Sequence, residues 1–194
     1  MNTMLRKSVL AIAGLTVAGG LAAGPLNHTT TDTTTNTTTT AVAQAKPDTT
    51  KLIPHGVQGN QSHIDLNDEQ TANTKAIIAA TKKAGMDERA AVVSIATALQ
   101  ESKLENLGHL GDRNAHDSQG LFQQRPSSGW GTVEQITDPE YSTTAFLTGL
   151  KQVDGWQNMP LTEAAQTVQV SAYPFHYAQW EQQAADLVAE HWNS

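Results

Sequence analysis

The chain contains no cysteine. This absence excludes disulfide bonds, thiolate metal sites and a cysteine nucleophile, so the folded part must be stabilised by its core alone. Basic residues are also few, because 12 Lys and Arg stand against 19 Asp and Glu in 194 residues, and they form no cluster. A nucleic-acid-binding protein normally carries a basic patch. We therefore expect no nucleic-acid partner.

Long apolar runs are missing except near the N-terminus. There, Arg6 and Lys7 precede the run VLAIAGLTVAGGLAA, a pattern that predicts a secretory signal peptide over residues 1–24. Small residues suited to cleavage occur at 21–23 and again as late as 41–45. An uncleaved membrane anchor is the alternative, because the run lies at the lower edge of the spanning range. We expect a secreted protein that meets the membrane only through this segment.

Threonine dominates the next part of the chain, which contains TTTDTTTNTTTT. Such a segment has almost nothing to bury and no periodicity, so residues 25–64 are predicted to be a disordered spacer. Asn27, Asn36 and Asn60 match the glycosylation sequon, and we interpret these matches as chance. The rest of the chain, residues 65–194, has the length of one folded domain.

The domain begins with two helix signatures. Asn67 and Gln70 form a capping box for a first helix that stops at Gly85, and Asp87 caps a second helix that runs to about Lys103. The second helix contains AAVVSIATALQ, which carries no charge. Because this helix is apolar nearly all round, it is predicted to be the buried central helix.

Three further helices follow. Asp138, with a proline after it, caps a helix that ends before Gly155, and Pro160 opens another that runs to about Ala172. The last helix follows Pro174, and one apolar stripe runs along it: Tyr177, Trp180, Ala184, Val188 and Trp192. Only QGLFQQ lacks the helical period. The predicted fold class is mostly α, with a buried central helix and at most a short β-hairpin.

Glu101 stands at the end of the central helix, one turn after Thr97. A carboxyl among apolar neighbours favours its neutral form, so it can hold a proton near neutral pH and deliver it. This is what a general acid requires. The alternative is a helix-end glutamate that simply reaches solvent.

The surroundings of Glu101 in the sequence favour the first interpretation. The segment QES, centred on Glu101, is followed after a polar loop by SQGLFQ, which begins at Ser118. Together they resemble the E-S…S-x-G-L-x-Q signature of the lysozyme-like superfamily, in particular soluble lytic transglycosylases and goose-type lysozymes. A looser resemblance to a secreted actinobacterial branch covers residues 68–180. The sequence departs from the pattern at Phe122, where methionine is common, and in its long loop at 103–117.

The resemblance implies a lysozyme-like domain that binds peptidoglycan glycan strands, with Glu101 as the catalytic acid and base. Two aromatic residues, Trp130 and Tyr173, are candidates for stacking on sugar rings, and core packing is their alternative role. The residues expected to line the cleft, some as amide partners for sugar hydroxyls, are Ser118, Gln119, Gly120, Leu121, Phe122, Gln123 and Gln124.

The resemblance favours the lytic transglycosylase reaction, which uses a single glutamate. A lysozyme-type hydrolysis needs a second carboxylate, for which Asp112 and Asp117 are the candidates. The same loop does not fit the calcium-binding EF-hand spacing, and His109 and His116 lack a third ligand for zinc. No metal and no cofactor are predicted.

Two function classes remain. The first is a secreted, cell-wall-associated enzyme that cleaves the β-1,4 bond between N-acetylmuramic acid and N-acetylglucosamine, acting as a monomer. The second is a non-catalytic lysozyme-like module that binds glycan or a surface partner from a Thr-rich stalk.

Overall fold

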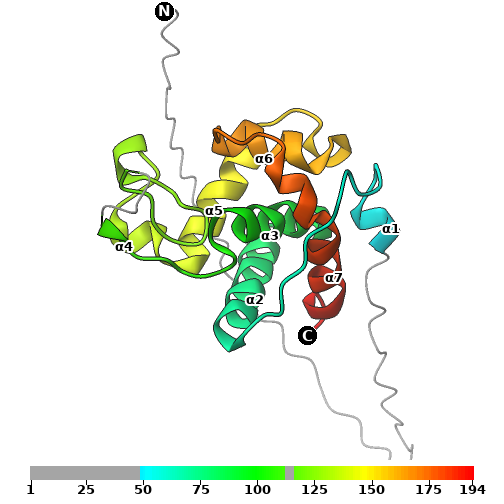
Figure 1. Cartoon of the computed structure of the whole chain (residues 1–194), viewed down its shortest axis with the longest axis horizontal. Helices are drawn as coiled ribbons and strands as arrows, with labels where there is room; N and C mark the ends of the chain where they lie inside the picture. The colour runs from blue at the N-terminus through cyan, green and yellow to red at the C-terminus, as the bar shows by residue number, and fades with distance from the viewer. Residues whose placement is uncertain (1–48, 112–115) are drawn as a thin grey trace, which may run out of the picture. The chain divides into compact units, whose positions relative to one another are not determined.

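The computed structural model of the protein describes residues 49–111 and 116–194, all of which belong to one compact unit. The predicted signal peptide and most of the predicted spacer lie outside the described residues. The described part is helical (Figure 1), and its elements are α1 Thr49–Leu52, α2 Asp68–Lys83, α3 Glu88–Ser102, η2 Pro126–Ser128, α4 Val133–Ile136, α5 Pro139–Leu150, η3 Trp156–Asn158, α6 Leu161–Gln169, η4 His176–Trp180 and α7 Glu181–His191.

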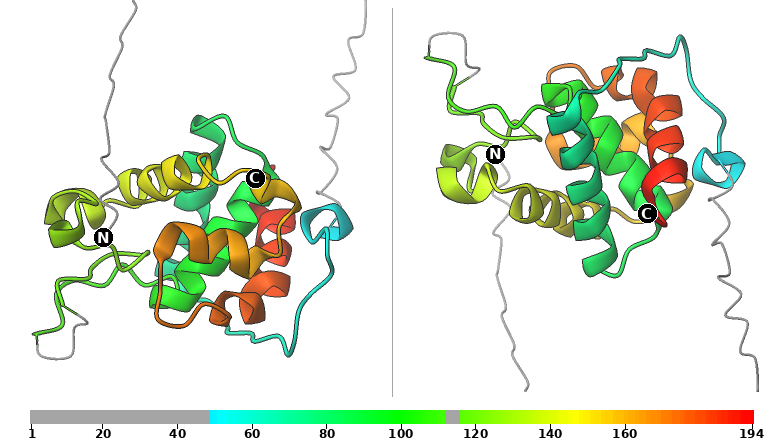
Figure 2. Two further views of the ribbon diagram at one scale, coloured as in Figure 1. Left: turned by 90° about the horizontal axis from the view of Figure 1, so that it is seen from above. Right: turned by 90° about the horizontal axis from the view of Figure 1, so that it is seen from below.

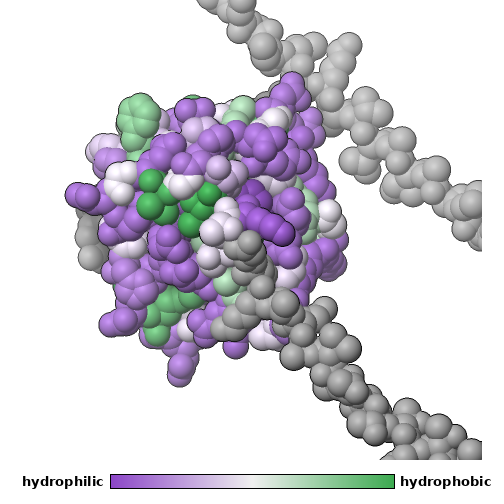
Figure 3. All heavy atoms as spheres, turned by 90° about the vertical axis from the view of Figure 1, so that its right-hand side faces the viewer, coloured by the Kyte–Doolittle hydropathy of each residue, from purple (hydrophilic) through white to green (hydrophobic). Residues whose placement is uncertain are grey.

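The mostly-α prediction is confirmed. Where the sequence leaves room for a hairpin, Gln119 and Gln124 form an isolated antiparallel bridge, and the described residues contain no strand. No helix within 49–111 or 116–194 is both long and apolar enough to cross a membrane. The face shown in Figure 3 is mostly hydrophilic, and its apolar areas are small and separate.

The two predicted helix starts are confirmed. The Asn67 side chain accepts a hydrogen bond from the backbone N–H of Gln70 at 2.9 Å, and the Gln70 side chain accepts one from the Asn67 N–H at 2.9 Å. Asp87 accepts a bond from the Ala90 N–H at 3.1 Å and so caps α3. Each cap satisfies N–H groups that a helix start leaves unpaired.

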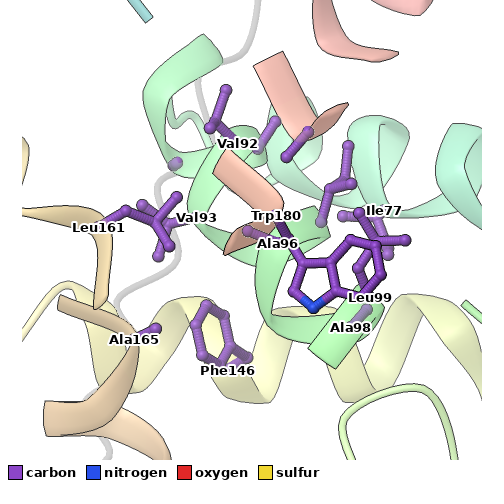
Figure 4. Close-up of a cluster of buried hydrophobic side chains, with 14 of the residues drawn as sticks. Ile77, Val92, Val93, Ala96, Ala98, Leu99, Phe146, Leu161, Ala165 and Trp180 are labelled. Atoms are coloured by element: carbon purple, nitrogen blue, oxygen red, sulfur yellow. The ribbon is translucent and has the colours of Figure 1, made fainter. Parts of the chain in front are cut away.

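Helix α3 is the buried central helix that the sequence predicts. Its residues from Ala90 to Leu99 are buried, and α2, α5, α6 and α7 all pack against it. Two views in Figure 2 show α3 enclosed by these helices. Figure 4 shows the resulting core, in which the labelled side chains are Ile77, Val92, Val93, Ala96, Ala98, Leu99, Phe146, Leu161, Ala165 and Trp180.

The C-terminal third differs in detail from the prediction. Helix α6 ends at Gln169 rather than near Ala172, because Val170 takes the left-handed conformation (φ 52°) and the Gln166 side chain accepts a hydrogen bond from the Ser171 N–H. The predicted last helix begins as the 3-10 helix η4. The apolar stripe is nevertheless buried at Tyr177, Trp180, Ala184 and Val188.

A buried ion pair joins the start of α3 to the start of α7. The Arg89 guanidinium donates to the Glu181 carboxylate at 2.7 Å and, through the same nitrogen, to the Leu52 carbonyl at 2.7 Å. Its other terminal nitrogen donates to the Met159 carbonyl at 3.3 Å. Because both charges are buried, removing either partner would leave the other uncompensated. Arg89 therefore connects four segments that lie far apart in the sequence.

The packed part of the chain begins ahead of Asp65, the boundary that the sequence predicts. Residues 49–64, here called the N-terminal arm, run from α1 past α7 (Figure 1). Leu52 in α1 is buried in the core, and Ile53 and Ile64 pack against the core. A polar segment of this kind offers few apolar residues for a sequence-based prediction, and its order comes from contacts with distant helices.

We expect a chain that starts at Asp65 to be less stable than one that starts at Asp48. It loses the burial of Leu52, a contribution of about 1.5–3 kcal/mol, and it leaves Arg89 without the Leu52 carbonyl. Thermal unfolding followed by circular dichroism measures the difference. Equal melting temperatures would show that the arm adds nothing to the fold.

Candidate functional site

The candidate site is built around Glu101, in the last turn of α3. Its carboxylate is half-buried, and the Tyr177 hydroxyl donates a hydrogen bond to Oε1 at 2.7 Å. Burial raises the pKa of Glu101 above its ordinary value. The hydrogen bond from Tyr177, the amide of Gln169 and the charges of Lys103 and Arg125 act in the opposite direction, and burial outweighs them. Glu101 therefore holds its proton to higher pH than a solvated glutamate does.

The end of α3 places Glu101 at the edge of the core. Lys103 and Leu104 both adopt the left-handed conformation, with φ of 57° and 64°, and this stops the helix directly after Ser102. Leu104 is fully buried, so the chain turns back onto the core. The Lys103 ammonium lies 4.6 Å from the centre of the Trp180 ring, and burial lowers the pKa of this lysine.

Ser102 connects the two short segments QES and SQGLFQ. Its hydroxyl lies 2.8 Å from the Leu121 carbonyl oxygen and 3.1 Å from that of Ala98. Gly120 brings the second half close, because its φ is 76° and a Cβ there would lie 2.1 Å from the Ile136 carbonyl oxygen. No other residue fits at Gly120 without moving the backbone. The segment after Ser118 is thus fixed against the end of α3.

Most of the side chains predicted to line the cleft serve this fixation. Phe122 is buried and stacks on Phe146 with ring centres 5.1 Å apart. Gln124 is buried and donates to the Ser142 carbonyl at 3.0 Å. Ser118 accepts a hydrogen bond from Arg125 at 2.9 Å. The other buried members of this set are Gln119, Gly120 and Leu121.

Three predicted binding residues retain exposed surface. Gln123 is half-buried and donates to the Gly120 carbonyl at 3.1 Å, and Trp130 is also half-buried. Tyr173 is 63% exposed, and its ring stacks on His176 with centres 5.0 Å apart. Of the predicted aromatic pair, Tyr173 therefore offers more of its ring to a ligand.

The segment around Tyr173 is held firmly although its aromatic residues face solvent. It lies between Gln169 and Tyr177, which both act on Glu101. The Gln166 side chain donates to the Ser171 carbonyl at 2.9 Å. A bond of 2.6 Å from Thr162 to the Pro174 carbonyl adds a second fixed point. Phe175 in this segment is 76% exposed.

Of the two candidates for a second carboxylate, Asp112 and Asp117, the structure describes only Asp117. Asp117 accepts hydrogen bonds from the Ser127 N–H at 2.8 Å and the Ser127 hydroxyl at 2.7 Å, and these bonds lower its pKa. Both of its oxygens therefore hold the loop at η2. Asp112 lies outside the described residues. Within the described parts of the chain, no three His, Asp or Glu side chains lie close enough together to hold a metal ion.

The sequence predicts Tyr177 as part of an apolar stripe and gives no role to Gln169 or Phe175. Tyr177 is indeed buried, but its hydroxyl carries the contact to Glu101. The sequence does indicate a polar contact, since a buried tyrosine hydroxyl needs a hydrogen-bond partner. It does not identify Glu101 as that partner, because 76 positions separate the two residues.

No protein-family model matches the chain, and no curated protein is significantly similar to it. The geometry around Glu101 and the resemblance of the two short segments beside it are therefore the observations that bear on function.

Proposed function

We propose that the protein is a secreted, cell-wall-associated glycosidase that cleaves peptidoglycan between N-acetylmuramic acid and N-acetylglucosamine, with Glu101 as its catalytic acid. Protonation of the leaving oxygen requires a carboxyl that keeps its proton near neutral pH. The observation that carries the proposal is the burial of Glu101, which raises its pKa. The resemblance of QES and SQGLFQ to lysozyme-like proteins supports the same assignment.

In the proposed reaction, Glu101 acts twice. Its proton passes to the glycosidic oxygen, the bond from C1 of the muramic acid to that oxygen breaks, and positive charge develops on the ring. The Glu101 carboxylate then takes the proton of the 6-hydroxyl of the same sugar, and that oxygen bonds to C1. The products are a 1,6-anhydro ring and a free 4-hydroxyl, and Glu101 regains its proton without the consumption of water.

The surroundings of Glu101 support this single-carboxylate route. Tyr177 is a donor to Oε1, and burial raises the pKa of its hydroxyl, so the hydroxyl stays protonated. It stabilises the carboxylate in the interval before the proton returns. Asp117 is a poor candidate for a second catalytic carboxylate, because Ser127 occupies both of its oxygens.

Glycan binding is assigned to the exposed groups near the site. Tyr173 and Phe175 offer exposed aromatic faces, and Gln123 offers a half-buried amide. Trp130 is a further candidate for stacking. The same exposed aromatic residues would also serve a module that binds glycan without cleaving it, so catalysis has to be tested separately from binding.

Replacing Glu101 by glutamine separates the two functions. We expect Glu101→Gln to lower the rate of peptidoglycan cleavage by about 100- to 10,000-fold, because the amide has no proton to give. Binding to insoluble peptidoglycan should remain, since the amide oxygen still accepts from Tyr177. Zymography and a pull-down measure the two properties. An active Glu101→Gln variant would rule out the mechanism, and an inactive wild-type chain that binds would favour the binding module.

The same substitution should stabilise the protein at neutral pH. Because the native pKa of Glu101 is raised, the native state binds more protons than the unfolded state between the two pKa values, so Glu101 makes stability fall as pH rises through that window. Below the window the cost disappears. Glu101→Gln should therefore melt a few degrees above wild type at pH 7, with a smaller gain near pH 4. A variant that melts below wild type at pH 7 would contradict this account.

Tyr177→Phe should move the alkaline limit of activity upward. The hydroxyl stabilises the carboxylate and so lowers the pKa of Glu101, while burial raises it. Removal of the hydroxyl alone leaves burial in place, and the pKa of Glu101 rises further. Carbon NMR of the labelled carboxyl and the pH profile of cleavage should shift together. A fall in the pKa of Glu101 in this variant would show that the bond is not formed in solution.

Mass spectrometry of digested peptidoglycan identifies the reaction. We expect 1,6-anhydromuramic ends as the main product, and we expect Asp112→Asn and Asp117→Asn to remain active. Reducing muramic ends, together with an inactive aspartate variant, would instead indicate a hydrolase with two carboxylates.

A further inference from the structure

The N-terminal arm is hydrogen-bonded to the segment that carries Tyr177. The Gln61 side chain donates to the Ala178 carbonyl at 3.0 Å and accepts from the Gln182 N–H at 3.0 Å. The backbone N–H of Ser62 donates to the Gln179 carbonyl at 2.7 Å, and the Ser62 hydroxyl donates to the Gln179 side chain at 2.7 Å. Every contact falls on η4 or the first turn of α7.

A second pair of bonds fixes the end of the arm. The buried Gln183 side chain accepts from the Ile64 N–H at 3.1 Å and donates to the Ile64 carbonyl at 2.7 Å. This pairing imitates the exchange between two β-strands, with a side-chain amide in place of one backbone. It holds the arm alongside α7.

The same segment holds Gln100, the residue next to Glu101. The Gln100 side-chain oxygen accepts from the Gln179 amide at 3.0 Å and from the Trp180 indole at 2.9 Å. Gln179 thus accepts from Ser62 with one side-chain atom and donates to Gln100 with the other. A continuous chain of hydrogen bonds links the arm to the end of α3.

Helix η4 has little stability of its own. It is a 3-10 helix of five residues without a side-chain cap at its start, and 3-10 helices have poorer hydrogen-bond geometry than α-helices. Its position must therefore come from its neighbours. These neighbours are α3, α6 and α7, which pack against η4, and the arm, which is hydrogen-bonded to it.

We propose that the N-terminal arm positions η4, so that Gln61, Ser62 and Gln179 are positioning residues for Tyr177 and Glu101. Their hydrogen bonds go to the backbone of Ala178 and, by way of Gln179, to Gln100, and through these groups they act on the position of Glu101. This role of the arm in placing Glu101 does not depend on the reaction, and only its effect on cleavage rests on the proposed function.

The groups that act on Glu101 determine in which direction its pKa should change when the arm is released. The titratable or charged ones are Tyr177 from η4, Lys103 from the end of α3 and Arg125 from the loop before η2. Release of the arm loosens η4 and admits water to Glu101. Because burial is the largest influence on its pKa, the pKa falls toward the ordinary value. This shift is opposite in sign to that expected for Tyr177→Phe.

The test uses the full chain with Gln61→Ala and Gln179→Ala, and Gln182→Ala as the matched control. The Gln182 side chain donates to Asp186, and the bond from this residue to the arm comes from its backbone N–H, which the substitution keeps. Ser62→Ala is a milder variant, because it keeps the backbone bond to Gln179. Carbon NMR of the labelled Glu101 carboxyl measures the pKa, and thermal unfolding confirms that each variant is folded.

The proposal expects a lower Glu101 pKa in Gln61→Ala and Gln179→Ala, a smaller shift in the same direction in Ser62→Ala, and none in Gln182→Ala. If the chain cleaves peptidoglycan, kcat should fall by up to about 100-fold, as for a catalytic group that is misplaced, with KM unchanged. Folded Gln61→Ala and Gln179→Ala variants with the wild-type pKa would overturn the proposal. A shifted pKa in a chain without activity would support it and reject the proposed function alone.

Discussion

A helix that is covered on every side can present a functional group only at its ends, and this constraint governs the molecule. Between Ala90 and Leu99 every position of α3 is filled by packing. At its start, Arg89 forms a buried ion pair. At its end, Glu101 is only half-buried and accepts a hydrogen bond from Tyr177. The core therefore decides where chemistry can occur, and the adjoining segments decide what kind.

The site also shows a conflict between stability and chemistry. Burial of Glu101 raises its pKa, so the carboxyl keeps its proton to higher pH. The same burial lowers the stability of the fold whenever the carboxyl ionises. Tyr177 reduces this cost, because its buried hydroxyl donates a hydrogen bond to the carboxylate. The rest of the fold must compensate for a carboxyl whose burial lowers stability and raises its pKa.

The sequence predicts best what is decided locally. The caps at Asn67, Asp87 and Asp138 depend on residues three positions away, and all three form as expected. The contact of Tyr177 with Glu101 joins residues 76 positions apart, and no periodicity reports it. Likewise, the arm before Asp65 is polar, so its composition resembles a spacer. Its order depends on hydrogen bonds to residues more than 110 positions away.

The ion pair between Arg89 and Glu181 spans 92 positions of the chain. During synthesis, α3 can form its turns early, but its buried charge has no partner until α7 has been made. Contacts of this separation close late, because the loop between them must be ordered first. The nascent protein therefore passes through a stage at which Arg89 has been made and its counter-charge Glu181 has not. The ion pair, and with it the contact between the starts of α3 and α7, can form only after the start of α7 has left the ribosome.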